Sequence, residues 1–267
     1  MNYLNKGLSK EIREKLFLLE RVCGDESAKC KRSLIFKKMQ EGALLTDSLV
    51  NSYRIEYNPK NSSPRSSRHN EKRLSKKGLT NLREAFKWGK KNLEVTRLNK
   101  EFIENLNLRI APELYPKGFK YPTTRAYISG ASVNPPYPEK IQIKELPNFF
   151  SSLNQQLSSE DPIERLNSGI FAHFQIARIH PFMDGNGRTA RMLQDLIFEK
   201  FEIPIPAIKS GERGTYFTFL YMASRDWKEQ NNWESSAKIT EGERNLYTFI
   251  AEKVNISLDY VLDKMKI

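Results

Sequence analysis

The chain has 267 residues, 39% of them hydrophobic, so it is long enough to bury a core as one domain or as a domain with a smaller appendage. Its 44 Lys and Arg against 32 Asp and Glu give a net charge of +12, which favours polyanionic partners, although a lysine-rich solvated surface explains the same excess. Two cysteines without metal-ligand spacing indicate neither a zinc site nor a disulfide framework, and no apolar run approaches the length of a membrane span.

Apolar residues recur at spacings of three and four in the N-terminal part of the chain. Residues 9–23 and 45–53 carry this pattern, which predicts helices that end near Pro59. Residues 60–70 are polar, Ser-rich and basic, so they offer little apolar area for burial. This composition is typical of an exposed loop.

Helical spacing returns at residues 79–86 and 102–106. The stretch 125–141 is rich in proline, which biases each preceding residue toward extended backbone, so it predicts a short isolated β-hairpin.

The next helix has a clear start signal, with Asp161 as the cap, Pro162 at the first helical position and Glu164 placed to reach back. An apolar stripe continues from there to His180. A second helix is expected to follow and to stop at Pro204, so a tight loop should join the two helices.

Residues 180–191 read His-Pro-Phe-Met-Asp-Gly-Asn-Gly-Arg-Thr-Ala-Arg. The Gly-Asn-Gly run allows positive φ angles and gathers N–H groups where a helix begins, which forms an anion site. Two arginines three positions apart lie on one helix face, where they can hold further phosphate oxygens. The predicted phosphate-binding residues are Gly185, Asn186, Gly187, Arg188 and Arg191.

Two residues beside this cradle carry the remaining chemistry. Asp184 is a hard oxygen ligand suited to a Mg²⁺ ion that keeps water and phosphate as its other ligands. His180 titrates near neutral pH and is the candidate general base. Phe182 and Met183 are expected to do no chemistry and to pack.

The segment resembles the Fic family signature His-x-Phe-x-(Asp/Glu)-Gly-Asn-Gly-Arg-x-x-Arg, with every fixed position filled. The resemblance implies an all-α, mainly helical Fic fold with a short β-hairpin flap. It also implies a Mg²⁺-dependent protein adenylyltransferase that moves AMP from ATP to a Ser, Thr or Tyr hydroxyl of a target protein and releases pyrophosphate.

The resemblance assigns roles within the motif. His180 deprotonates the target hydroxyl, Asp184 holds Mg²⁺, and Asn186 with the loop amides grips the α-phosphate. Arg188 serves the β-phosphate and Arg191 the γ-phosphate.

The resemblance extends more weakly from about residue 40 to about residue 235. Residues 127–139 resemble the family's flap, shortened here, which holds a target peptide as an added strand. Tyr216 falls where relatives place an aromatic residue near the adenine, and a place in the core is the alternative. His173 is expected to be a buried, hydrogen-bonded histidine, because a catalytic zinc site would need a third ligand.

Ser52 and Glu56 lie four residues apart, so they share a helix face. This pair resembles the inhibitory helix that precedes the core in one class of the family. Glu56 is then expected to pair with Arg191 and to compete with the γ-phosphate. Tyr57 departs from the Gly or Asn usual at that position.

Three regions are predicted. Residues 1–76 form an N-terminal helical region with the inhibitory helix at about 45–57 and the basic loop; residues 77–240 form the Fic core; residues 241–267 form a C-terminal helix. About 30 residues follow Trp233, too few for the winged-helix domain that many relatives carry.

Two other functions stay open: a Fic-fold phosphotransferase acting on a phosphate or phosphocholine group, and a catalytically silent basic binding module. A P-loop ATPase is excluded because no Gly-x-x-x-x-Gly-Lys-Ser/Thr sequence occurs. The expected partner is a target protein, and nucleic acid is not expected. Self-modification and a homo-oligomer remain open. The missing apolar leader predicts the cytoplasm, with a secreted effector as the alternative.

Overall fold

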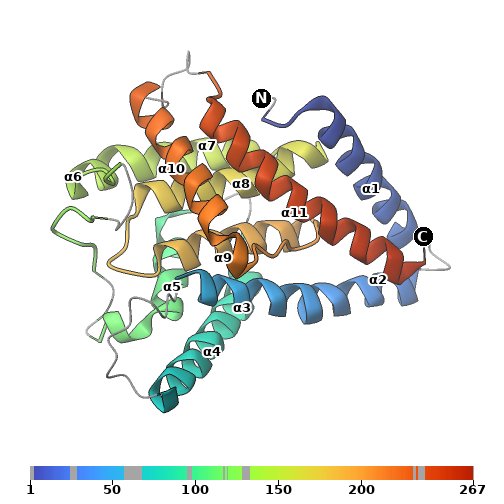
Figure 1. The fold of residues 1–267 in the computed structure, drawn as a ribbon, viewed down its shortest axis with the longest axis horizontal. Helices are drawn as coiled ribbons and strands as arrows, with labels where there is room; N and C mark the ends of the chain where they lie inside the picture. The colour runs from blue at the N-terminus through green and yellow to red at the C-terminus, as the bar shows by residue number, and fades with distance from the viewer. Residues whose placement is uncertain are drawn as a thin grey trace.

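The computed structural model describes residues 3–24, 29–56, 68–94, 98–116, 118, 120–127, 133–230, 233 and 238–266. These residues form helices and connecting loops without a strand, which confirms the all-α class (Figure 1). The longer helices are α1 (Lys6–Gly24), α2 (Lys29–Met39), α3 (Leu45–Glu56), α4 (Arg68–Asn92), α5 (Lys100–Ile110), α7 (Leu146–Leu157), α8 (Pro162–Ile179), α9 (Asn186–Lys200), α10 (Arg213–Gln230) and α11 (Glu241–Met265). Within these ranges, no helix combines the length and the apolar character needed to cross a membrane.

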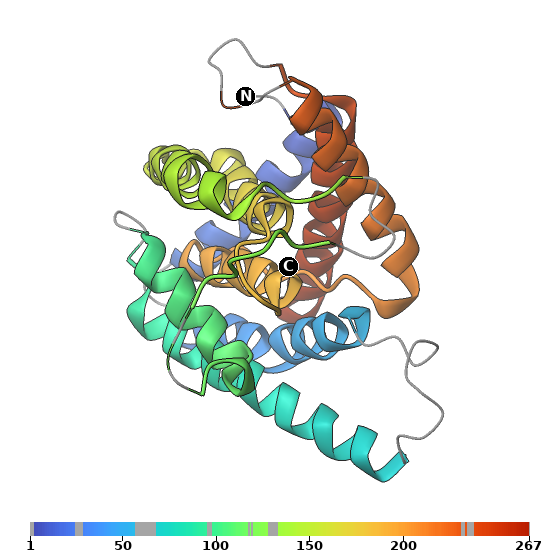
Figure 2. The ribbon, with the colours of Figure 1, turned by 90° about the vertical axis from the view of Figure 1, so that its left-hand side faces the viewer.

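Helices α8 and α9 form the centre of the fold. Most side chains of both are buried, as expected for helices that neighbours cover on every side. Helix α8 packs on α7 and α9, and α9 also contacts α3, α4 and α5. Figure 2 shows α3, α4 and α5 below this pair, with α10 and α11 to its right.

The start of α8 follows its predicted signal. Asp161 Oδ1 accepts hydrogen bonds from the backbone N–H groups of Ile163 (2.7 Å) and Glu164 (3.1 Å), and Pro162 occupies the first turn. The cap fixes where α8 begins and therefore where its last turn delivers His180.

The N-terminal helices cover the core and lead to the motif. Helix α2, a π-helical turn at Gln40–Leu44 and α3 follow one another without a break, and α3 packs on α9. Helix α1 contacts α11, and Tyr3, which precedes α1, stacks on Tyr247 of α11 at 4.0 Å between ring centroids. The C-terminal end of α3 lies at the N-terminal end of α9, where Glu56 contacts Arg188 and Arg191.

The loop predicted at residues 60–70 ends earlier than expected. Helix α4 begins at Arg68, inside that segment, while residues 57–67 lie outside the described part of the chain. Residues 68–92 contain no proline and are mostly good helix formers, so the helix extends back to Arg68.

The β-hairpin expected at residues 125–141 is not found among the described residues. Residues 120–127 and 133–137 form no strand, and 128–132 lie outside the described ranges. Prolines lack the N–H group that a ladder needs. A side chain joins the two arms instead, because Arg125 Nε donates to the Pro135 carbonyl at 2.8 Å.

Candidate functional site

The motif loop turns sharply between α8 and α9. Gly185 has φ of +73°, and a Cβ at this position would lie 3.2 Å from Asn107 Nδ2, so the turn requires glycine. Asn107 itself braces the loop, donating to the Asp184 carbonyl and to Thr189 Oγ1 at 3.0 Å each. Sequence reasoning missed Asn107, although a polar residue between buried positions of α5 was a visible signal.

The structure places the Asn186 side chain differently from the predicted phosphate contact. Its Oδ1 accepts from Phe182 N–H at 2.8 Å and its Nδ2 donates to the Phe182 carbonyl at 2.9 Å. Both ends of the amide therefore hold the loop, and the side chain is not turned toward the cavity as a phosphate ligand. Phe182 is buried as predicted, whereas Met183 is 55% exposed and lines the cavity instead of packing.

His180 follows directly on the last turn of α8. It adopts the left-handed conformation, with φ 54° and ψ 54°, a conformation that costs a non-glycine residue about 1–3 kcal/mol and is typical of functional sites. Its Nδ1 lies 3.4 Å from the Ala177 carbonyl, which leaves Nε2 as the nitrogen available to a substrate. Burial lowers the pKa of His180, because the charged ring loses solvation.

Glu56 lies at the end of α3 and bridges both motif arginines. Its Oε1 lies 2.8 Å from Arg191 Nη2, and its Oε2 lies 2.8 Å from Arg188 Nε. The contact with Arg191 agrees with the sequence prediction, and the contact with Arg188 was not predicted. A Cβ at Gly187 would lie 2.3 Å from Glu56 Oε1, so the second glycine of the loop makes room for this carboxylate.

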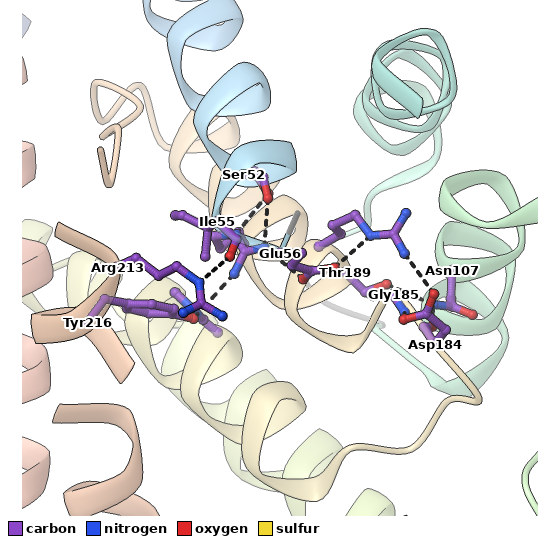
Figure 3. A network of polar contacts seen from close by, with 12 residues as sticks. Ser52, Ile55, Glu56, Asn107, Asp184, Gly185, Thr189, Arg213 and Tyr216 are labelled. Carbon is purple, nitrogen blue, oxygen red and sulfur yellow. Dashed lines mark hydrogen bonds and ion pairs between the residues drawn. The ribbon is translucent and has the colours of Figure 1, made fainter. Parts of the chain in front are cut away.

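Ser52 joins the same cluster, as its spacing from Glu56 predicted (Figure 3). Arg191 Nε donates to Ser52 Oγ at 2.8 Å and Nη2 donates to the Ser52 carbonyl at 3.1 Å. The Arg191 side chain is only 5% exposed, so these bonds replace water around a buried guanidinium.

Two further contacts, which the sequence did not predict, hold α3 in place. Arg213 of α10 donates from Nε to the Ile55 carbonyl at 2.7 Å, which satisfies an acceptor in the last turn of α3. Ser48 Oγ donates to Asp195 Oδ2 at 2.6 Å inside the core. Burial raises the pKa of Asp195 to about 7, against the hydrogen bond from Ser48 that lowers it.

The raised pKa of Asp195 predicts a specific pH dependence of stability. A carboxyl whose folded pKa lies above its unfolded value destabilises the fold as pH rises between the two values, here from about 4 to about 7. Asp195→Asn should remove this loss, which amounts to at most about 4 kcal/mol. Denaturant unfolding of the unaltered protein and of Asp195→Asn at pH 4.5 and 7.5 measures this loss. The free energy of unfolding of Asp195→Asn, relative to that of the unaltered protein, should be higher at pH 7.5 than at pH 4.5. An equal difference at both pH values contradicts the assignment.

Tyr216 lies in the core at the rim of the site. It is fully buried, and its hydroxyl lies 2.8 Å from His173 Nε2 and 3.4 Å from Arg191 Nη1. His173 is also fully buried, and its Nδ1 lies 2.8 Å from Gln194 Oε1. The expectation of a buried, hydrogen-bonded histidine is met, and the Tyr216 hydroxyl supports Arg191.

A cavity of about 1040 Å³ opens over the motif, at the upper end of the range for small-molecule sites. One wall carries His180, Asp184 and Arg191, and α10 provides an aromatic wall with Phe217 and Tyr221. Arg125 and Tyr137, one from each arm, also line the cavity. The cavity therefore combines charged and aromatic lining.

Asp184 is the motif residue suited to a metal ion. Its side chain is 61% exposed, with Oδ1 accepting from Gly185 N–H at 2.6 Å and Oδ2 facing Arg188 Nη2 at 3.1 Å. The described residues contain no cluster of three or more His, Cys, Asp or Glu that could hold a metal. One carboxylate fits Mg²⁺ that a nucleotide's phosphates also coordinate, and does not fit a metal bound by protein ligands alone.

Residues 97–198 match the model of the Fic/DOC family. Among curated proteins, the chain is 31% identical over 133 residues to the protein adenylyltransferase Fic of Drosophila grimshawi and 34% identical over 106 residues to protein adenylyltransferase fic-1 of Caenorhabditis briggsae. These alignments cover 49% and 39% of this chain but only 26% and 20% of the relatives, so the chain matches about a quarter of their length.

Solved structures share the fold over nearly the whole chain. A Fic domain containing signaling protein from Bacteroides thetaiotaomicron superposes with a TM-score of 0.74 at 17% identity and covers 97% of both chains. Fic-1 (residues 134–508) from C. elegans gives 0.69 at 18% identity, over 97% of this chain and 73% of that one. The chain therefore carries a match to the Fic/DOC family over residues 97–198, within a fold that solved Fic-domain structures share.

Proposed function

We propose that this protein transfers AMP from ATP to a Ser, Thr or Tyr hydroxyl of a target protein. The observation that carries the proposal is that His180, the Asn186–Gly187 turn and Arg191 line one large cavity, with Arg188 on the same helix as Arg191. The curated relatives named as protein adenylyltransferases support the same activity.

In the proposed reaction, His180 acts as the base. His180 Nε2 accepts the proton of the target hydroxyl as its oxygen forms a bond to the α-phosphorus. The bond from the α-phosphorus to the oxygen that bridges to the β-phosphate breaks, and its electrons leave with pyrophosphate. Target and AMP are then joined by a phosphodiester, and the proton on His180 passes to solvent.

The arginines hold the leaving group in this scheme. Arg188 and Arg191 present charged N–H donors, so the β- and γ-phosphates stay in place while charge develops on pyrophosphate. Asp184 would hold a Mg²⁺ ion with the phosphates, and that ion would neutralise part of the same charge.

The same geometry supports a built-in restraint by α3. Glu56 uses donors of both arginines, so a bound γ-phosphate would have to replace its carboxylate. The protein then rests in a state of low activity until the end of α3 moves away, and binding energy from a partner is one source for that displacement.

The lowered pKa of His180 predicts how the reaction depends on pH. Since burial favours the neutral ring, the base stays ready below the ordinary imidazole pKa of about 6.5. In Glu56→Gly, the acid limb of kcat/KM for ATP should fall below that value, because Glu56 is also a charge that raises the pKa of His180. An acid limb at or above pH 6.5 contradicts this assignment.

Labelled ATP distinguishes the proposed function from its rivals. Glu56→Gly is incubated with Mg²⁺ and ATP labelled at the α- or the γ-phosphate, with candidate target proteins and alone for self-modification. Protein label from the α position that depends on His180, with the adenylylated residue identified by mass spectrometry, supports AMP transfer. Label from γ alone makes the protein a phosphotransferase, and the absence of His180-dependent label favours the binding module.

A further inference from the structure

A chain of buried polar side chains leads from Arg191 into the core. Arg191 Nη1 lies 3.4 Å from the Tyr216 hydroxyl, which lies 2.8 Å from His173 Nε2. His173 Nδ1 lies 2.8 Å from Gln194 Oε1, and the Gln194 side chain also hydrogen-bonds Asp195. The rings of His173 and Tyr216 are fully buried, so water does not compete for these bonds.

The direction of each bond follows from the chemistry of its partners. Gln194 Oε1 can only accept, so His173 Nδ1 carries a hydrogen and donates. Burial lowers the pKa of His173 to about 3, so the ring is neutral and its Nε2 can only accept. The Tyr216 hydroxyl must then donate to Nε2, which turns its lone pairs toward Arg191.

Tyr216 has a special place among the partners of Arg191. In the described part of the chain, the other hydrogen bonds of the Arg191 side chain go to Ser52 and Glu56, which both lie on α3. Tyr216 lies on α10. When α3 moves away, the Tyr216 hydroxyl is therefore the acceptor that stays with the guanidinium.

We infer that His173 is a positioning residue: it fixes the direction of the Tyr216 hydroxyl, which then orients Arg191 for the terminal phosphate of ATP in the displaced state of α3. The identity of that phosphate rests on the proposed function. His173 takes no proton in the reaction and touches no substrate, so its effect appears in nucleotide affinity.

Calorimetric binding of ATP and of AMP to Glu56→Gly tests the inference, because AMP lacks the phosphate that Arg191 would hold. Adding Tyr216→Phe or His173→Phe should weaken ATP binding by about tenfold, the scale of one hydrogen bond to a charged group, and should leave AMP binding unchanged. His173→Gln, whose amide can accept from the Tyr216 hydroxyl, should recover most of the loss. ATP affinity unchanged by either Phe variant, or an equal loss for ATP and AMP, overturns the inference.

The matched control is Tyr247→Phe. Tyr247 is likewise fully buried, and it stacks on Tyr3 away from the cavity. Removing its hydroxyl should leave the affinities for both nucleotides as in the parent. An ATP-specific loss in this variant would overturn the assignment to Tyr216 and His173.

A second measurement does not depend on nucleotide binding. The chain has 3 histidines, so ¹⁵N spectra of histidine-labelled protein resolve His173 once His69→Gln and His180→Asn assign the other two. His173 should show a hydrogen on Nδ1, a bare Nε2 and no titration between pH 5 and 8. A ring protonated on Nε2, or charged at pH 7, overturns the inference. If Glu56→Gly binds no ATP, the proposed function fails. The spectrum still decides the direction of the hydrogen bonds between Gln194, His173 and Tyr216.

Discussion

Glu56→Gly is expected to raise AMP transfer by about 100-fold over the unaltered protein, which corresponds to a coupling of about 3 kcal/mol between the carboxylate and the γ-phosphate. The reason is geometric: Glu56 lies 2.8 Å from a nitrogen of each motif arginine, and Arg191 is almost completely enclosed. Glycine removes the competing charge without filling its space. Initial rates with α-labelled ATP measure the effect.

The control for this change is Arg54→Gly. Arg54 is exposed in the last turn of α3. Its substitution therefore places a glycine at the same helix end without changing the contacts of Arg188 and Arg191. Glycine in a helix costs about 1 kcal/mol, so both variants loosen α3 to a similar extent. Equal rates for Glu56→Gly and Arg54→Gly would attribute the gain to helix fraying and contradict competition by the carboxylate.

His180→Ala in the Glu56→Gly background is expected to lower AMP transfer by about 10²–10⁴-fold, the usual contribution of a general base. No other histidine lines the cavity within the described residues, so no second imidazole replaces it there. The phosphate cradle stays intact, and ATP binding should therefore be retained. Single-turnover transfer of α-labelled AMP and calorimetric ATP binding measure the two effects.

The conformation of residue 180 calls for a second variant. Since His180 has φ of 54°, alanine is strained there, whereas asparagine tolerates the left-handed region and provides no base. His180→Asn should lose transfer as severely as His180→Ala while keeping the melting temperature of the parent. Transfer retained in His180→Asn would mean that residue 180 acts through loop geometry and not as the base.

The helical core and the motif were predictable because their signals are local. The cap at Asp161, the apolar stripe to His180 and the glycines of the loop each depend on neighbours within a few residues. The spacing of Ser52 and Glu56 likewise predicted a shared face, although only the resemblance connected that face to Arg191.

The parts that escaped prediction join residues far apart in the chain. Asn107 contacts the motif loop, and Ser48 contacts Asp195, and the partners of each contact lie more than 70 positions apart in the sequence. Periodicity along the sequence does not reveal such contacts. The second partner of Glu56, Arg188, depended on the exact approach of α3 to α9. Among the described residues the hairpin failed for a local reason, since its prolines lack the donors that pairing requires.

A crystal structure of Glu56→Gly with Mg²⁺ and a non-hydrolysable ATP analogue would show whether Glu56 and the γ-phosphate compete for one site. The γ-phosphate should lie within hydrogen-bond distance of Arg191, in the space that Glu56 occupies, with the α-phosphorus facing His180 Nε2. A nucleotide bound in the reverse direction, with its terminal phosphate at His180, or bound outside the cavity, would contradict it.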